Sequence, residues 1–231
     1  MKRSLTWVIA TRNAHKVGEI QAILGPAFEY RTLRDFPGMP AVREDAPDFA
    51  GNAVKKATEI AQFVAQHAEK LAGDGEPWVM ADDSGLEVDA LNGAPGVHSA
   101  RFAAADTTSG NSPDAANNEK LLSLLQDVPM ERRTARFRCV IAVTPVLFER
   151  AEGGVCYASE KELRTELFEG KCEGRIAFEP SGGGGFGYDP LFVPNGFSES
   201  FAQLGETIKN GLSHRAKALE QLRAWAQRLK S

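Results

Sequence analysis

The feature that most constrains the fold is a short apolar run followed by two adjacent carboxylates. Residues 78–81 (Trp-Val-Met-Ala) predict a short buried strand, which ends at Asp82 and Asp83 before a Ser84-Gly85 pair that favours a tight turn. The carboxyl ends of strands border the ligand crevice of a sheet, and neighbouring strand residues point to opposite sides. One carboxylate is therefore placed to face a bound ion while the scaffold holds the other. On this stretch alone, a solvated turn explains the same residues equally well.

The composition narrows the class of function. With 231 residues, of which 42% are hydrophobic and 25% charged, the chain suits a globular protein of one domain or two closely joined lobes. Its net charge of -4 disfavours general nucleic-acid binding, because phosphate backbones are usually met by basic surfaces. Three cysteines without metal-type spacing, no signal-peptide pattern and no apolar run that could span a bilayer predict a cytoplasmic protein with no membrane partner.

The N-terminal region contains a candidate anion site. Residues 5–10 predict a buried strand and residues 14–24 a helix, with a polar loop, Thr11-Arg12-Asn13-Ala14-His15-Lys16, between them. The start of a helix offers N–H groups and a positive dipole that suit a phosphate, and Lys16 adds a cation. The loop lacks the glycine pattern of a Walker site, and an Asn13 that only caps the helix explains it about as well.

A second helix is predicted from about Phe49 to Glu69, and one lysine departs from its pattern. Its apolar stripe comprises Phe49, Ala53, Ala57, Ile60 and Val64. Lys56 lies on or beside this inward face, so it needs a partner. Either its stem snorkels to water, or its ammonium points into a site that also holds anions. Glu44, just before the helix, is a candidate carboxylate for that site, although a solvated loop is the default.

A glycine-rich segment at residues 181–190 (Ser-Gly-Gly-Gly-Gly-Phe-Gly-Tyr-Asp-Pro) is the second organising element. Glycines allow close backbone approaches that side chains would block, so we expect a ligand to approach this loop. Phe186 offers a stacking face and Asp189 an acceptor, a combination that suits a nucleobase. A flexible linker is the plain alternative.

Three further elements are predicted along the chain. Ser112-Pro113-Asp114 predicts a helix start, with a cap and a proline in the first turn. Residues 135–143 alternate as in a strand, and pairs of strands are expected through residues 163–176. Ser213 is predicted to cap a last helix whose core face comprises Ala218, Leu222, Trp225 and Leu229. His214 and Arg215 then lie in its first turn, where ligands meet helix dipoles.

Four of these motifs, in this order, give the chain a resemblance to a known family. They are Thr11-Arg12-Asn13-Ala14-His15-Lys16, Ala81-Asp82-Asp83-Ser84-Gly85-Leu86, Gly184-Gly185-Phe186-Gly187-Tyr188-Asp189-Pro190 and Ser213-His214-Arg215. The set spans nearly the whole chain and resembles the Ham1-like inosine/xanthosine triphosphate pyrophosphatases. The resemblance implies a single α/β domain over residues 1–231, with an elongated mixed β-sheet, flanking helices and two lobes around a central cleft. It also implies a homodimer and Mg2+-dependent hydrolysis of ITP, dITP and XTP to the monophosphate and pyrophosphate.

The resemblance also implies a role for each matched residue. Asp83 is expected to be the general base and a metal ligand, with Glu44 as the second ligand and Asp45 as the alternative to it. Thr11 to Lys16 are expected to bind the triphosphate, and Phe186 to Asp189 with His214 and Arg215 to form the base pocket. The expected substrate-binding residues are Thr11, Arg12, Asn13, Ala14, His15, Lys16, Lys56, Ser84, Phe186, Gly187, Tyr188, Asp189, Lys209, His214 and Arg215.

These roles agree with the chemistry of the reaction. A triphosphate needs Mg2+ and several cations, to which Lys16, Lys56 and, by our own inference, Arg101 contribute. Donors near His214 and Arg215 would pair with the 6-keto group of the purine, and adenine would leave them unpaired. Guanine shares the 6-keto edge, and these residues do not explain its exclusion.

Two other functions compete with this interpretation. One is a Maf-type pyrophosphatase for modified pyrimidine or methylated nucleotides, which should lack the Ser213-His214-Arg215 helix start. The other is a non-catalytic nucleotide sensor, against which the intact Asp83 and Glu44 argue. The segment from about residue 144 to 174 is longer than the family pattern and is expected to alter the second lobe or the dimer contact.

Overall fold

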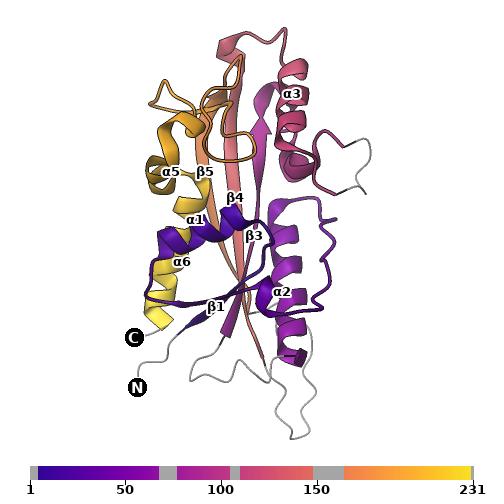
Figure 1. Ribbon diagram of the computed structural model, residues 1–231, viewed down its shortest axis with the longest axis vertical. Helices are drawn as coiled ribbons and strands as arrows, with labels where there is room; N and C mark the ends of the chain where they lie inside the picture. Colours follow the sequence, from indigo (N-terminus) through magenta and orange to yellow (C-terminus); the bar gives the residue numbers. More distant parts are fainter. Residues whose placement is uncertain (1–4, 68–76, 105–109, 148–163, 230–231) are drawn as a thin grey trace, which may run out of the picture. The chain divides into compact units, whose positions relative to one another are not determined.

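The computed structural model describes residues 5–67, 77–104, 110–147 and 164–229 (Figure 1). Its strands are β1 (Thr6–Ile9), β2 (Glu29–Thr32), β3 (Pro77–Val88), β4 (Thr134–Pro145), β5 (Glu166–Ile176) and β6 (Phe192–Pro194). Its helices are α1 (Ala14–Leu24), α2 (Phe49–His67), α3 (Asp114–Leu124), α5 (Phe201–Leu212) and α6 (His214–Leu229). Short 3-10 turns are η1 (Leu33–Asp35), η2 (Asp89–Leu91), η3 (Gly96–Arg101) and η4 (Met130–Arg132). None of the described helices is long and apolar enough to cross a membrane.

The six strands form one mixed sheet in the order β2-β1-β3-β4-β5-β6. β1 runs parallel to both β2 and β3, whereas β5 and β6 are antiparallel. The register between β1 and β3 ends at the pair Ile9 and Met80, and the Ala10 N–H donates to the Met80 carbonyl at 2.8 Å. The predicted α/β fold with a mixed sheet and flanking helices is confirmed.

The chain divides into two compact units. The first comprises Met1–Asp83, Val140–Phe168 and Ala218–Ser231, and the second comprises Ser84–Cys139 and Glu169–Lys217. The division falls inside β3, β4, β5 and α6, so these elements contribute residues to both units. Asp83 and Ser84, neighbours in the sequence, belong to different units.

In the first unit, helices cover both faces of the strands. The predicted apolar stripe of α2 is confirmed, because all five of its residues are buried. On the other face, Trp225 of α6 meets Trp78 of β3 edge to face, with ring centroids 5.1 Å apart. α2 and α6 accordingly lie on either side of β1 and β3 in the view of Figure 1. The last-helix prediction holds for Ala218 and Leu222, but Leu229 is 49% exposed and does not face the core.

In the second unit, aromatic side chains dominate the core. Phe137 of β4 packs against Phe192 of β6 and Phe201 of α5, at ring distances of 4.7 and 6.2 Å. Leu86 of β3 and Leu121 of α3 are fully buried in the same cluster. This core anchors α3 and α5 around the glycine-rich segment.

The predicted end of the central strand is wrong. β3 does not stop at residue 81 but continues through Asp82, Asp83 and the Ser84-Gly85 pair to Val88. Leu86 and Val88 are fully buried, and the Leu86 N–H donates to Ser99 Oγ at 2.9 Å. Burial of these apolar side chains outweighs the turn preference of Ser and Gly, because strand formation depends mainly on packing context.

Other predicted boundaries need smaller corrections. α3 begins at Asp114, Pro113 occupies the cap position, and no side chain caps the helix. Residues 68–69 of the predicted second helix lie outside the described residues, as do residues 148–163 of the long segment. The strand predicted at residues 135–143 is confirmed within β4. The pairs of strands predicted over residues 163–176 are wrong for the described part, where β5 is one continuous strand.

Candidate active site

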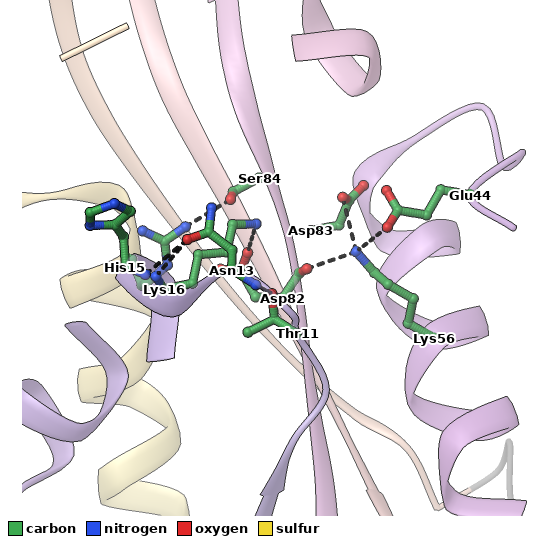
Figure 2. Close-up of polar contacts among 10 residues, drawn as sticks. Thr11, Asn13, His15, Lys16, Glu44, Lys56, Asp82, Asp83 and Ser84 are labelled. Atoms are coloured by element: carbon green, nitrogen blue, oxygen red, sulfur yellow. Dashed lines mark hydrogen bonds and ion pairs between the residues drawn. The ribbon is translucent and has the colours of Figure 1, made fainter. Parts of the chain in front are cut away.

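Asp82 and Asp83 present their carboxylates to opposite faces of β3 (Figure 2). Successive strand residues alternate between faces. Asp82 pairs with Lys16 of α1 and shares its face with Trp78, whereas Asp83 pairs with Lys56 of α2. Both pairs lie in the first unit, just beyond the last paired residues of β1 and β3, Ile9 and Met80. The prediction of two carboxylates on opposite sides is confirmed, although the strand continues past them.

Lys56 is held inside a ring of oxygen atoms. Its residue is only 8% exposed, so the ammonium does not snorkel to water. Nζ donates to the Asp82 carbonyl at 2.8 Å, to Glu44 Oε1 at 3.1 Å and to Asp83 Oδ1 at 3.2 Å. Burial lowers the pKa of Lys56, but Asp83, Glu44 and Asp82 together outweigh it and raise the pKa above its usual value. The lysine therefore stays charged against two carboxylates.

The structure distinguishes the two acidic residues before α2. Glu44 shares the Lys56 ammonium with Asp83, and its side chain is 34% exposed. Asp45 turns instead to Lys55, at 2.6 Å, and to Arg43, at 3.5 Å. The geometry favours Glu44 over Asp45 as the second carboxylate beside Asp83.

Asp83 carries a buried oxygen that the described residues leave unsatisfied. The residue is 6% exposed, and Oδ2 makes no hydrogen bond within the described part of the chain. Burial is the largest influence and raises the pKa of Asp83, opposed by Lys56 and Lys16 and reinforced by Glu44. The Asn52 amide also lowers it, although its geometry does not meet that of a hydrogen bond. A buried carboxylate oxygen without a partner is costly unless a ligand satisfies it.

The Glu44–Asp83 pair fits a hydrated Mg2+ better than a protein-enclosed metal. Among the described residues, no three His, Cys, Asp or Glu side chains gather as a metal site. Mg2+ needs fewer protein ligands, because it is usually bound by one or two carboxylates together with water and substrate phosphates. The unsatisfied Asp83 Oδ2 and the adjacent Glu44 supply hard oxygen donors of that kind.

The loop at the start of α1 is organised by its own side chains (Figure 2). Asn13 caps the helix, because its Oδ1 accepts from the N–H groups of His15 at 2.9 Å and Lys16 at 3.2 Å. Thr11 Oγ1 accepts from the Asn13 N–H at 3.2 Å. The capping role, one of the two interpretations of Asn13, is thus present in the structure. It does not exclude a phosphate at the same helix start.

A cavity of about 520 Å³ adjoins this loop within the first unit. Arg12 lines it and donates from Nη2 to the Met39 carbonyl at 3.1 Å, which ties the loop to the segment after η1. Arg34 is its second cation. The lining residues are Thr11, Arg12, Ala14, Val17, Thr32, Leu33, Arg34, Phe36, Pro37, Gly38 and Met39. Among the described residues, two guanidinium groups and no carboxylate side chain line the cavity. The Asp35 carboxylate adjoins this lining, because its Oδ2 accepts from the Thr32 N–H at 2.6 Å.

The second unit gathers the residues that were predicted for base recognition. Lys209 and Asp189 form a buried ion pair at 2.6 Å, with side chains 3% and 2% exposed. The Lys209 ammonium also lies 4.4 Å from the centre of the Phe186 ring. Asp189 Oδ2 accepts in addition from the Phe186 N–H at 2.9 Å. Lys209 therefore contacts the ring of Phe186, and Asp189 holds its backbone N–H.

The start of α6 supplies the remaining predicted residues. Arg215 is 1% exposed, donates from Nη2 to Ser84 Oγ at 2.9 Å and lies 6.0 Å from the Phe186 ring centre. His214 stacks on Phe137 at 4.8 Å. Ser213 caps the helix, as predicted, by accepting from the Ala216 N–H at 3.2 Å.

Gly187 and Tyr188 are held by residues that the sequence analysis did not assign to the site. Asp114 and Asn118 of α3 hydrogen-bond the backbone of Gly187, and the Tyr188 hydroxyl donates to the Ser99 carbonyl at 2.9 Å. Burial, followed by the nearby Asp114, raises the pKa of Tyr188. The sequence carried a partial signal, since Asp114 lies in the predicted helix start, but nothing linked that helix to the glycine-rich segment.

Two glycines of the glycine-rich segment are required by close contacts within the protein itself. A Cβ on Gly185 would lie 2.2 Å from Asp189 Oδ2, and its φ of +75° disfavours other residues. A Cβ on Gly182 would lie 2.7 Å from the backbone of Ala202. The close approaches expected of a ligand are thus made, at these two positions, by the chain itself.

Comparison with known proteins places this arrangement in context. The model of the Ham1 family matches residues 7–225. The dITP/XTP pyrophosphatase of Desulforamulus reducens is 46% identical over 215 residues, covering 93% of this chain and 92% of the relative. The dITP/XTP pyrophosphatase of Opitutus terrae is 43% identical over 227 residues, covering 95% and 98%.

Solved structures similar to this chain have names that describe the same kinds of protein. A HAM1 protein from Coxiella burnetii superimposes with a TM-score of 0.76 at 33% identity, covering 97% of this chain and 99% of that one. A nucleoside-triphosphatase, dITP/XTP pyrophosphatase, from Mycobacterium abscessus gives a TM-score of 0.65 at 36% identity, covering 94% and 98%.

Proposed function

Because this chain belongs to the Ham1 family, we propose that it is a nucleoside triphosphate pyrophosphatase that hydrolyses ITP, dITP and XTP to the monophosphate and pyrophosphate. The observation that carries the proposal is the buried group of Asp83, Glu44 and Lys56. It combines an unsatisfied carboxylate oxygen, a second carboxylate and a fixed cation. Hydrolysis of a triphosphate requires a base for water and neutralisation of phosphate charge, which are the properties of such a group.

In this proposal Asp83 orients the attacking water and accepts its proton. The water oxygen forms a bond to the α-phosphorus, the bond from that phosphorus to the bridging oxygen breaks, and pyrophosphate leaves. Glu44 and Asp83 would hold Mg2+, which when bound neutralises charge on the triphosphate oxygens. Lys56 donates to both carboxylates and fixes their positions, and Thr11 to Lys16 bind phosphate at the start of α1.

Recognition of the base is assigned to the second unit. Phe186 stacks on the purine, while Lys209 contacts its ring and Asp189 holds its backbone N–H. Donors of His214 and Arg215 pair with the 6-keto oxygen, so adenine, which presents an amino group there, leaves them unpaired. Ser84 contacts the substrate from its position beside Arg215. Arg101, which ends η3, is a further cation for the phosphates.

The test is to incubate the purified protein with Mg2+ and, separately, ITP, XTP, dITP, GTP and ATP, measuring pyrophosphate and orthophosphate. Pyrophosphate with monophosphate from only the first three supports the proposal. Orthophosphate release would place the attack at a different phosphorus. Binding of ITP without turnover would favour a sensor, and turnover restricted to modified pyrimidine or methylated nucleotides would favour a Maf-type enzyme.

Two properties complete the proposal. The protein is a homodimer, as the family resemblance implies, and analytical ultracentrifugation tests this. It acts in the cytoplasm on the free nucleotide pool, without nucleic-acid or membrane partners.

A further inference from the structure

α3 holds one residue of the glycine-rich segment at both of its backbone polar groups. The Gly187 N–H donates to Asp114 Oδ2 at 2.7 Å, and Asn118 Nδ2 donates to the Gly187 carbonyl at 3.0 Å. Asp114 and Asn118 are four residues apart, so they lie on the same side of the helix, one turn after the other. Together they form a clamp, here called the α3 clamp.

The clamped residue is conformationally special. Gly187 has a φ of +61°, in the left-handed region that other residues rarely adopt. Its two neighbours in the chain are also held within the second unit. The N–H of Phe186 donates to Asp189, and the hydroxyl of Tyr188 donates to the Ser99 carbonyl. Two successive N–H groups, of Phe186 and Gly187, are therefore each bound by a carboxylate, one from inside the segment and one from α3.

The geometry points to Asp114 and Asn118 as positioning residues for base recognition, because the α3 clamp sets the backbone that carries the Phe186 ring. This inference rests on the proposed function, in which Phe186 stacks on the purine. Both hydrogen bonds of the clamp lie within the second unit, whereas the buried carboxylates and the loop at the start of α1 belong to the first. Its loss is expected to weaken binding of the base and to leave the chemical step and phosphate binding nearly unchanged.

The variants are Asp114→Ala and Asn118→Ala in the full-length protein. Each is expected to raise the KM for ITP, and the Kd for IMP measured by calorimetry, by roughly fivefold, the size of one hydrogen bond. kcat and the Kd for inorganic pyrophosphate, which has no base, should stay within about twofold of the unsubstituted protein. Asp114→Asn keeps an acceptor oxygen for the Gly187 N–H and is expected to restore the KM.

Asn117→Ala is the matched control. Asn117 is also a buried asparagine of α3, 2% exposed, but its Oδ1 accepts from the Ala103 N–H at 2.8 Å and not from Gly187. Asn117→Ala should lower the unfolding temperature about as much as Asn118→Ala does, but it should not raise the KM for ITP comparably. An equal rise in this control, or equal changes in the affinities for IMP and pyrophosphate, would show that α3 acts only on stability.

The unsubstituted protein and the clamp variants together show whether the clamp inference or the proposed function is wrong. If the unsubstituted protein neither hydrolyses ITP nor binds IMP, the function proposed above is wrong and the assigned role of the clamp is wrong with it. If the unsubstituted protein is active and both clamp variants keep its KM for ITP, only the clamp inference is overturned.

Discussion

Asp82 and Asp83 are consecutive residues of β3, yet each pairs with a lysine from a different helix on a different face of the strand. The Asp82 pair ties β3 to α1. The Asp83 pair faces α2 and leaves one carboxylate oxygen without a hydrogen bond among the described residues. One dipeptide thus presents one carboxylate to Lys16 of the proposed phosphate loop and the other, with an unsatisfied oxygen, to Lys56.

Asp83→Asn is expected to abolish turnover while the protein still binds nucleotide. The amide is isosteric but cannot accept the proton of the attacking water, so kcat should fall by roughly 10²–10⁴-fold. Asp82→Asn makes the same change on the other face and should lower kcat far less. Both are measured as pyrophosphate release from ITP. Normal turnover by Asp83→Asn would remove Asp83 from the role of base.

Lys56→Met is expected to destabilise the fold strongly. It leaves Asp83 and Glu44 facing each other without their shared cation, and breaking a buried ion pair costs about 3 kcal/mol. Lys55→Met, the neighbouring substitution, removes only an exposed pair with Asp45 and should have little effect. Urea unfolding measures both. Equal unfolding midpoints for the two variants would mean that the buried ammonium contributes no net stability.

Mg2+ is expected to stabilise the Lys56→Met variant more than the unsubstituted protein. Without the ammonium, the two carboxylates repel each other, and a cation that binds them raises the folded population by mass action. The measurement is the unfolding temperature at increasing Mg2+ concentration. The Lys56→Met/Glu44→Gln double variant lacks one proposed ligand and should lose most of this gain. An equal gain in all three proteins would argue against a site at Glu44 and Asp83.

Gly185→Ala is expected to disrupt the support of Phe186. The new Cβ would lie 2.2 Å from Asp189 Oδ2 at a φ of +75°, so the Asp189 carboxylate that pairs with Lys209 must shift. Strain of this kind costs on the order of 1–3 kcal/mol and should also raise the KM for ITP. Gly183→Ala, with no atom within 4 Å of the added Cβ, is the control. Similar unfolding midpoints for both variants would contradict the steric argument.

The Cys172 thiol is expected to react slowly in the folded protein. Burial raises its pKa to about 11, a shift that Lys217 opposes and Glu173 reinforces, so little thiolate is present at pH 8. The raised pKa contributes stability that is complete below the unfolded value of about 8.5 and is lost as pH rises toward 11. Alkylation by iodoacetamide, followed at the Cys172 peptide, should be fast only in urea. Rapid labelling of the native protein would show that the residue opens to solvent.

Much of the local structure follows from the sequence alone. The 3.6-residue period predicts α2 and its buried stripe, and the cap residues Asn13 and Ser213 predict the starts of α1 and α6. These features depend on neighbours within a few residues, so a linear pattern contains the necessary information. The end of β3 could not be predicted in this way, because Ser84-Gly85 stays extended only through burial of Leu86 and Val88 against distant elements.

By itself, the sequence determined the positions of β1, α1, α2 and β4, the start of α6, the inward position of Lys56 on α2 and the four motifs that identify the family. It did not predict β2 or α5. Tertiary structure alone decided which charges meet. It placed Lys56 between Glu44 and Asp83, turned Asp45 outward to Lys55, and set Asp114 and Asn118 against Gly187. The physical reason is the distance along the chain over which each interaction acts. Helix periods and caps act over one or two turns, whereas these ion pairs and backbone contacts join residues 10 to 73 positions apart, which only the packed chain brings together.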